Sequence, residues 1–337
     1  MRTTETLTGR RVTMADVASV AGVSKITVSR ALGGSELVKA EVRTRICETA
    51  AAMGYRMNLA ARDLRLRQRK RIAVVVDMPA TNDRPFYDPY PLALLGGIMQ
   101  ECAAAGFAIV LTTSDPRMGA EAQDASGIIV LGQGVDHHAV RSLTSLNLPL
   151  AVWGADDGVE ATMGAEVVGS DNRLGGQLAA RHLIARDRRR FVFLGDTHHA
   201  EIADRAAGFA QGLAAGAQIV AQRGCDFTRE GGRKAMADIV HEGVAFDGVF
   251  AGSDLVAIGA MQAMTDAGFR PGVDIAVVGY DDIPAAAAHT PRLTTIHQDL
   301  TGAGRLLAAT LLSRLDPERF HAPRTRSLPV TLVARET

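Results

Sequence analysis

Runs of apolar residues alternate with helix-like stretches along the chain from Ile72 onward. Valine and isoleucine dominate the runs, whereas alanine, leucine and glycine dominate the stretches between them. The runs cover residues 72–77, 107–113, 127–132, 150–154, 191–196, 248–254 and 275–282. Strands that are buried on both faces of a parallel sheet give such continuous runs, so the pattern predicts βαβ units. Roughly 260 residues of this pattern exceed one usual α/β domain, and we therefore expect two lobes.

A shorter pattern precedes the first apolar run and predicts small helices. Thr13 followed by Asp16 fits a capping box that opens a helix running to about Val20. Gly22 permits a tight turn before a second helix over Lys25–Leu32.

A third helix is expected from about Ala40 to a stop at Gly54, because Val42, Ile46 and Met53 recur at helical spacing. Valines of the first two helices would form a buried seam: Val17, Val20, Val23 and Val28. Two short helices joined through a glycine turn and braced by a third are typical of a DNA-reading helix-turn-helix.

In that geometry the start of the second helix points at base edges in the major groove. Lys25 and Arg30 can bond guanine O6 and N7, and Ile26 can touch a thymine methyl group. Three hydroxyl side chains are placed to bond phosphates or bases: Ser24, Thr27 and Ser29.

The charge distribution agrees with a nucleic-acid partner for the N-terminal part alone. The formal net charge is zero, but residues 1–71 hold 15 Lys and Arg against 6 Asp and Glu. The remaining residues hold 22 against 31. A basic head on an acidic body indicates that only the head meets a polyanion.

Composition excludes several other classes of protein. The 337 residues are 47% hydrophobic and 22% charged, which is ordinary for a globular protein. We find neither an apolar run of about 18 residues for a membrane span nor an apolar segment for secretion. The three cysteines are isolated (Cys47, Cys102 and Cys225), which favours a reducing cytoplasm over a disulfide framework.

Polar residues end several of the apolar runs: Asp77, Asp196, Ser253-Asp254 and Asp281-Asp282. In an open parallel sheet, ligands bind beyond the carboxyl ends of the strands, so these residues suggest a polar ligand cleft. Each of them alone is better explained as a helix cap.

Several segments in order resemble the lactose-repressor/galactose-repressor (LacI/GalR) family of bacterial transcription regulators. The resemblance begins with VTMADVASVAGVSKITVSRAL (12–32) and MGYRMNLAARDL (53–64). It continues through VGSDN (168–172), DRAAGF (204–209), AGSDLVAIGAM (251–261), VVGYDD (277–282) and LTTIHQD (293–299). It implies a homodimer, or a tetramer, that binds a pseudo-palindromic operator and a small-molecule effector, most simply a sugar that releases the repressor from DNA.

The resemblance also implies the domain organisation. A helix-turn-helix domain would span 1–57, a hinge helix and linker 58–71, and an effector-binding and dimerisation domain 72–337. That last domain would have two doubly wound lobes like a periplasmic sugar-binding protein. The N-lobe would take about 72–168 and 298–326, and the C-lobe about 169–297 and 327–337, with crossover strands near 168–172, 295–298 and 325–328.

By position, residues 58–66 would be the hinge helix that the family places in the minor groove. Leu64 matches the leucine that the family wedges between base pairs, and an apolar stripe packing on the body is the alternative. The further minor-groove candidates are Asn58, Arg62 and Arg65. Met57 stands where the family commonly has proline, and Asp63 where it often has a small polar residue.

The family's effector contacts carry over at a few positions. Arg205 matches the arginine that bonds ligand hydroxyls or a carboxylate, and its planar fork suits a polyol. The other effector candidates are Asp281, Ser253, Asp254 and, more weakly, Asp171. Trp153 and Tyr87 are candidates for stacking on a sugar face, ahead of Phe86 and Tyr90, with ordinary packing as the alternative.

No enzyme or cofactor motif emerges, so we expect no catalysis, no cofactor and no metal. The GQG at 132–134 lacks the third glycine of a dinucleotide motif. The adjacent pairs His137-His138 and His198-His199 are expected on the surface rather than on one metal. The acid pairs Asp156-Asp157 and Asp281-Asp282 have no nucleophile beside them and are expected to bond a ligand or cap helices.

There are three alternatives to a sugar-released cytoplasmic repressor, and the sequence argues against the second and the third. One is a ligand-enhanced repressor or activator that responds to a nucleobase or another metabolite. A sugar-binding transport component would need an export signal and no basic head. An α/β enzyme with an accessory DNA domain would need a nucleophile or cofactor motif.

Overall fold

The computed structural model describes residues 12–33, 35, 37–55, 70–77, 88–113 and 124–337. The chain divides into two compact units, Met1–Arg69 and Lys70–Thr337. Among the described helices, none combines the length and the apolar character that a membrane crossing requires.

The first unit holds α1 (Met14–Ala21), α2 (Lys25–Leu32) and α3 (Ala40–Ala52). The predicted capping box opens α1: the backbone N–H of Thr13 donates to Asp16 Oδ2 at 2.8 Å, and the Thr13 hydroxyl accepts from the Asp16 N–H. Gly22 ends α1 at φ 66°, a left-handed conformation that glycine adopts without strain. These local signals confirm the predicted helix-turn-helix.

The core of the first unit differs at one predicted position. Val17, Val28 and Ile46 are fully buried, but Val20 is 66% exposed. The buried face of α1 runs through Val17, Ala18 and Ala21, so Val20 lies on the opposite side of the helix. The prediction that Val20 belongs to the seam was therefore wrong.

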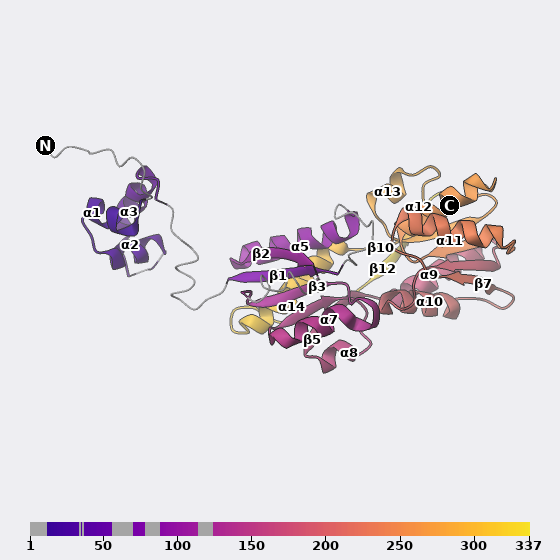
Figure 1. Cartoon of the computed structure of the whole chain (residues 1–337), viewed down its shortest axis with the longest axis horizontal. Coiled ribbons are helices and arrows are strands. Elements are labelled where there is room, and N and C mark those ends of the chain that lie inside the picture. The colour runs from indigo at the N-terminus through magenta and orange to yellow at the C-terminus, as the bar shows by residue number, and fades with distance from the viewer. Residues whose placement is uncertain (1–11, 34, 36, 56–69, 78–87, 114–123) are drawn as a thin grey trace. The chain divides into compact units, whose positions relative to one another are not determined.

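The second unit contains two sheets, one parallel and one mostly parallel, each between layers of helices (Figure 1). The first sheet has the order β11-β5-β4-β3-β1-β2, and all of its pairings are parallel. Its strands are β1 (Arg71–Val76), β2 (Ala108–Thr113), β3 (Gly127–Leu131), β4 (Leu150–Trp153), β5 (Ala165–Ser170) and β11 (Ser327–Leu328). The accompanying helices are α5 (Pro89–Ala105), η2 (Val135–His137), α7 (His138–Leu143), η3 (Thr144–Leu146), α8 (Val159–Thr162) and α14 (Leu300–Leu315). We call this sheet with its helices the first lobe.

The second sheet has the order β12-β10-β9-β8-β6-β7, and only β12 is antiparallel, to β10. Its strands are β6 (Arg190–Leu194), β7 (Gln218–Arg223), β8 (Gly248–Ala251), β9 (Ala276–Asp281), β10 (Thr294–Gln298) and β12 (Val330–Val333). Its helices are α9 (Asn172–Ala185), α10 (Ala200–Gln211), α11 (Arg229–His241), α12 (Asp254–Asp266) and α13 (Pro284–Ala288). This second lobe completes the predicted pair of α/β lobes.

Both lobes bury apolar side chains on both faces of their sheets. In the first lobe, α5 and α14 cover one face, and Ala139 and Val140 of α7 lie with the core on the other. Helices α5 and α14 approach so closely that a Cβ at Gly97 would stand 2.0 Å from the carbonyl oxygen of Thr301. In the second lobe, α11 and α12 cover one face and α9 and α10 the other. The chain passes between the sheets after β5, β10 and β11.

Candidate functional site

The exposed face of α2 carries the residues predicted to read bases. Val28 is buried in the small core, whereas Lys25, Ile26 and Arg30 are exposed. Ile26 is 65% exposed and is therefore accessible to a partner. Ser24 caps the N-terminus of α2, because its Oγ accepts a hydrogen bond from the N–H of Thr27 at 3.1 Å.

The hydroxyl candidates on this helix differ in exposure. Ser24 is exposed, and its Oγ lies 2.9 Å from Thr27 Oγ1. Thr27 and Ser29 are half-buried. The predicted minor-groove residues lie outside the described part of the chain, and their roles stay predictions: Asn58, Arg62, Leu64 and Arg65.

The second unit contains a cavity of about 350 Å³ lined by both lobes. It lies beyond the carboxyl ends of β1, β3, β6, β8 and β9, where an open parallel sheet places a ligand. The first lobe contributes Val76, Asp77, Tyr90, Pro91, Leu131, Gly132, Gly134 and Val135. The second lobe contributes Asp196, His199, Glu201, Arg205, Cys225, Asp226, Phe227, Ser253 and Asp281.

Arg205 is a fixed element of the cavity wall. Its side chain is buried, Nε donates to Asn172 Oδ1 at 2.9 Å, and Nη1 donates to the carbonyl of Gly252 at 2.6 Å. Its guanidinium carbon lies 3.7 Å from the centroid of the Tyr280 ring. Burial opposes the charge, but Tyr280 and Asp281 outweigh it and raise the pKa of Arg205. The guanidinium therefore presents a positive charge in a fixed orientation.

Asp281 and Ser253 also line the cavity. Asp281 has φ 111°, and its Oδ1 accepts a bond from Gln298 Nε2 at 2.7 Å. A non-glycine residue at such a φ is strained, and this strain lies in the cavity wall. Ser253 caps α12 through Val256, so its hydroxyl serves the helix as well as the cavity.

The structure corrects the expected placement of Asp254 and Asp171. Asp254 is fully buried outside the cavity lining, where it accepts bonds from the Thr295 hydroxyl at 2.5 Å and the Ile283 N–H at 2.9 Å. Burial first, and then Asp281, raise the pKa of Asp254 well above its ordinary value. Asp171 caps α9 by accepting from the N–H of Leu174 at 2.9 Å. Both carboxyl groups bond the fold itself.

The aromatic residues considered for stacking on a sugar also differ in whether they line the cavity. Trp153 is buried beside the cavity, and its Nε1 donates to Tyr90 Oη at 2.5 Å. Tyr90, which the sequence favoured less than Trp153 and Tyr87 for stacking on a sugar, lines the cavity directly. Burial, followed by the charge of Asp281, raises the pKa of Tyr90 and keeps its hydroxyl protonated. Tyr87 and Phe86 lie outside the described residues.

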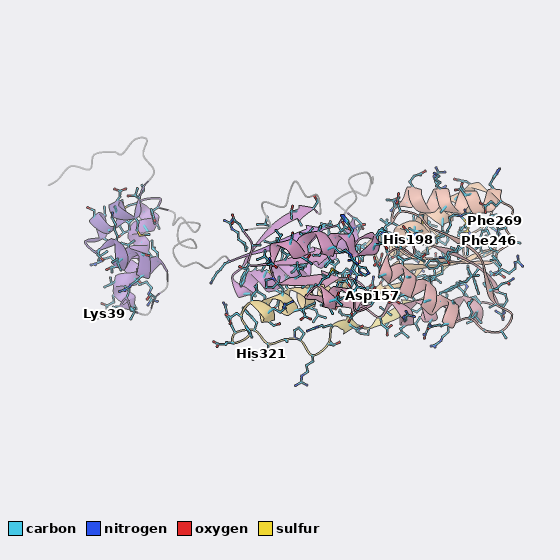
Figure 2. All side chains as sticks on the ribbon, turned by 60° about the horizontal axis from the view of Figure 1, so that its bottom comes forward. Lys39, Asp157, His198, Phe246, Phe269 and His321 are labelled. Atoms are coloured by element: carbon cyan, nitrogen blue, oxygen red, sulfur yellow. The ribbon has the colours of Figure 1, made fainter. Side chains whose placement is uncertain are left out.

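One histidine of the second pair lines the cavity. His198 is exposed (Figure 2), and its Nδ1 lies 2.6 Å from Asp196 Oδ1. Burial opposes ionisation of Asp196, but hydrogen bonds from the backbone and side chain of His198 outweigh it and lower the pKa of Asp196. His199 instead lines the cavity and meets the Phe227 ring edge-on, with centroids 5.1 Å apart. The prediction of two surface histidines fails for His199.

Four further lining residues were not predicted from the sequence: Glu201, Cys225, Asp226 and Phe227. Glu201 precedes Arg205 by four positions, so both fall on the same face of α10. Asp226 and Phe227 follow β7, a strand that the apolar pattern did not reveal. The thiol of Cys225 also lines the cavity, and burial raises its pKa to about 12, so it is not a thiolate.

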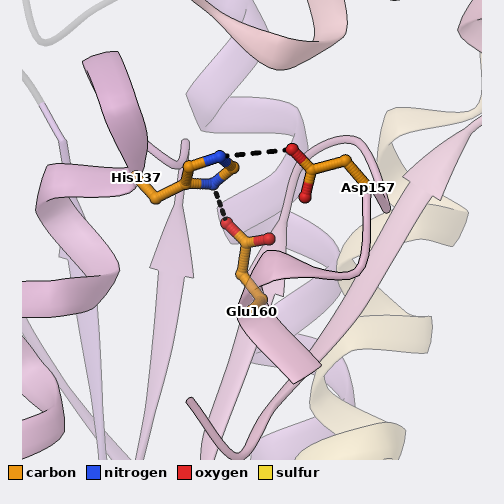
Figure 3. Close-up of side chains that lie close together, drawn as sticks. All are labelled: His137, Asp157 and Glu160. Atoms are coloured by element: carbon orange, nitrogen blue, oxygen red, sulfur yellow. Dashed lines mark hydrogen bonds and ion pairs between the residues drawn. The ribbon is translucent and has the colours of Figure 1, made fainter. Parts of the chain in front are cut away.

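His137, Asp157 and Glu160 form a cluster of polar contacts in the first lobe (Figure 3). His137 Nδ1 lies 2.5 Å from Glu160 Oε1, and its Nε2 lies 3.2 Å from Asp157 Oδ2. Glu160 is fully buried and also accepts from Gln133 Nε2 at 2.7 Å. The three side chains could offer ligand atoms to a metal, but each ring nitrogen already contacts a carboxylate. His137 is therefore not a surface histidine, and the cluster anchors Gln133 between two glycines that line the cavity.

Two family models match separate parts of the chain. Residues 13–58 match the family described as bacterial regulatory proteins, lacI family. Residues 180–337 match the periplasmic binding protein-like domain.

Individual relatives match over nearly the whole chain. The HTH-type transcriptional regulator CelR of Thermobifida fusca is 30% identical over 342 residues, covering 97% of this chain and 98% of CelR. The Lac repressor dimer bound to operator and the anti-inducer ONPF is 26% identical, with a TM-score of 0.82 over 97% of this chain and 99% of that one. The CelR–cellobiose complex is 27% identical, with a TM-score of 0.71 over 97% and 99%.

Proposed function

We propose, because the chain belongs to the lacI family of bacterial regulatory proteins, that it is a transcription repressor whose operator binding is controlled by a small carbohydrate. Two copies would bind a pseudo-palindromic operator, as the Lac repressor dimer binds its operator. The proposal is carried by the presence in one chain of a helix-turn-helix whose second helix exposes Lys25, Ile26 and Arg30 and, in the second unit, of a polar cavity lined by two lobes.

The head supports sequence-specific rather than general DNA binding. A basic surface alone would bind any duplex through its phosphates. The exposed face of α2 adds Ile26 between the two cationic residues Lys25 and Arg30. An apolar side chain gains nothing from phosphates but gains contact with a thymine methyl, so this face suits reading of base edges.

The cavity supports a carbohydrate effector. It combines a fixed guanidinium, carboxylates, and the rings of Tyr90 and Phe227, which is the mixture that binds the hydroxyl edges and the apolar face of a sugar. The solved complex of the relative CelR with cellobiose supports the same ligand class. Because the cavity is lined by both lobes, a ligand that fits one lobe arrangement better would shift the equilibrium between arrangements.

The DNA half of the proposal is tested by electrophoretic mobility shift of the full-length protein on the DNA upstream of its own reading frame. Arg30→Ala is expected to weaken binding to the preferred fragment by about 5- to 150-fold, the cost of one base contact of about 1–3 kcal/mol. Arg181→Ala removes an exposed charge from α9 and is the matched control, with no expected effect. Equal binding of the Arg30→Ala variant and the unmodified protein would contradict base reading by α2.

A further inference from the structure

A second, much smaller space adjoins the effector cavity. It measures about 10 Å³, which is room for a single water-sized group. The two spaces share Tyr90, Gly132, Glu201 and Arg205. The small one is further lined by Trp153, Gly154, Ser170, Asn172 and Gln298. It is therefore a side pocket of the cavity, beside the ends of β5 and β10, where the chain passes between the lobes.

Three polar atoms on the side pocket's lining residues are buried and have no hydrogen-bond partner within the described chain. They are Ser170 Oγ, Glu201 Oε2 and Gln298 Oε1. Leaving a buried polar atom unpaired costs free energy, so three such atoms around one small space indicate a missing partner. Two of the three can only accept hydrogen bonds when Glu201 is ionised.

The orientation of the Gln298 amide is set by its neighbour. The side chain of Gln298 is 3% exposed, and its Nε2 donates to the carboxylate of Asp281 at 2.7 Å. A carboxylate accepts hydrogen bonds, so the NH₂ group must face Asp281. The carbonyl oxygen is then the Gln298 atom available to the side pocket.

The charge of the main cavity also bears on which donor group would occupy the side pocket. Five carboxylates line it: Asp77, Asp196, Glu201, Asp226 and Asp281. Arg205 is the only Lys or Arg among the described lining residues. Among the described lining residues the acidic groups thus outnumber the basic ones, which favours a cationic group on the ligand over an anionic one.

We propose that the effector is an amino sugar and that its ammonium group occupies the side pocket formed by Ser170, Glu201 and Gln298. An ammonium group is one heavy atom, which matches the space, and its N–H groups can donate to Glu201, Gln298 and the oxygen of Ser170. A water could satisfy the same three groups, because the Ser170 hydroxyl can also donate, so it is the positive charge that favours an ammonium group here. Arg205 lines both spaces, so the carboxylate of Glu201 would lie beside both cations, and the aromatic rings would hold the rest of the sugar in the main cavity. This inference rests on the proposed carbohydrate effector and specifies its chemical class.

The test compares matched ligands on the full-length protein. The panel is the 2-amino- and 6-amino-hexoses of gluco, galacto and manno configuration, each beside its parent hexose, its N-acetyl derivative and its 6-phosphate. Binding is followed through the fluorescence of Trp153, the chain's single tryptophan, which lines the side pocket. At least one amino sugar is expected to bind about tenfold or more tightly than its parent hexose, as a charge-assisted hydrogen bond gives. Equal or tighter binding of the neutral or phosphorylated partner, or no binding of any amino sugar, overturns the proposal.

A pair of variants tests the assignment to the side pocket. Glu201→Gln keeps the shape of the side chain and removes its charge, so the preference for the amino sugar over its parent should fall about tenfold. Glu230→Gln, in an exposed ion pair with Arg233 on α11, is the control and should leave that preference unchanged. Ser170→Ala should weaken the amino sugar alone. A preference that survives both Glu201→Gln and Ser170→Ala places the ammonium elsewhere and overturns the assignment.

The outcome is distinguishable from failure of the proposed function. If a neutral hexose binds and releases the operator, the carbohydrate-controlled repressor stands and the amino-sugar assignment fails. If no sugar binds but the preference for one DNA sequence persists, the carbohydrate effector and the amino sugar both fail, and the DNA-binding function stands.

Discussion

The guanidinium carbon of Arg205 lies 3.7 Å from the centroid of the Tyr280 ring. The same arginine bonds Asn172 at the start of α9 and the carbonyl of Gly252 after β8. One side chain thus fixes the relative positions of three structural elements and also lines the effector cavity. Loss of Arg205 should therefore affect both stability and ligand binding.

Arg205→Ala is expected to lower the free energy of unfolding by about 3 kcal/mol, because it leaves buried partners without their charged donor. It should also abolish the thermal stabilisation that an effector gives. Arg205→Lys keeps the charge but not the planar fork, so it should bind the effector weakly as well. Denaturant unfolding and thermal shift measure the two effects. A full effector-induced shift in either variant would remove Arg205 from the ligand site.

The first unit offers a matched pair of valines on α1. Val17 is fully buried and Val20 is 66% exposed. Val17→Ala should destabilise the head by about 1–2 kcal/mol, whereas Val20→Ala should change its stability by less than about 0.5 kcal/mol. Hydrogen exchange of the α1 amides in the full-length protein measures both. Equal effects would mean that the buried face of α1 is assigned wrongly.

Adjacent glycines on α5 allow a similar comparison. A Cβ at Gly97 would collide with the backbone of Thr301, whereas a Cβ at Gly96 would meet nothing within 4 Å. Gly97→Ala should cost about 1–3 kcal/mol through forced separation of α5 and α14. Gly96→Ala should stabilise the protein by about 0.5–1 kcal/mol, because alanine favours the helix. Thermal unfolding decides, and a Gly97→Ala variant as stable as Gly96→Ala would contradict the close helix contact.

The raised pKa of Asp254 predicts that the stability of the protein depends on pH. Its folded-state pKa is raised above the ordinary value of about 4, so the folded state holds a proton that the unfolded state releases. Its contribution to stability is complete below about pH 4 and is lost as the pH rises toward the folded pKa. Asp254→Asn should remove this contribution and flatten the decline. Urea unfolding from pH 4 to pH 8 measures it, and parallel curves for variant and unmodified protein would show that Asp254 does not titrate this way.

The sequence predicted elements more reliably than side-chain environments. All seven apolar runs contain strands, because strands that are buried on both faces of a sheet are rich in valine and isoleucine. The edge strand β7 was missed, since its residues Gln218–Arg223 are half-buried or exposed and give no apolar run. Glu201 can be placed beside Arg205 only once both are known to lie on one helix. The side pocket can be found only from the three-dimensional structure. Whether Asp254 faces a ligand or a Thr295 hydroxyl depends on a neighbour 41 residues away, which local pattern cannot reveal.

Occupation of the cavity should control the affinity of the helix-turn-helix for DNA. Operator DNA is titrated at several concentrations of a sugar shown to bind through Trp153 fluorescence, and binding of the DNA is followed by fluorescence anisotropy. We predict that the operator Kd rises at least tenfold at saturating sugar and that half of this change occurs at the sugar concentration that half-fills the cavity. An operator Kd that is unchanged, or lowered, at full occupancy would contradict the account.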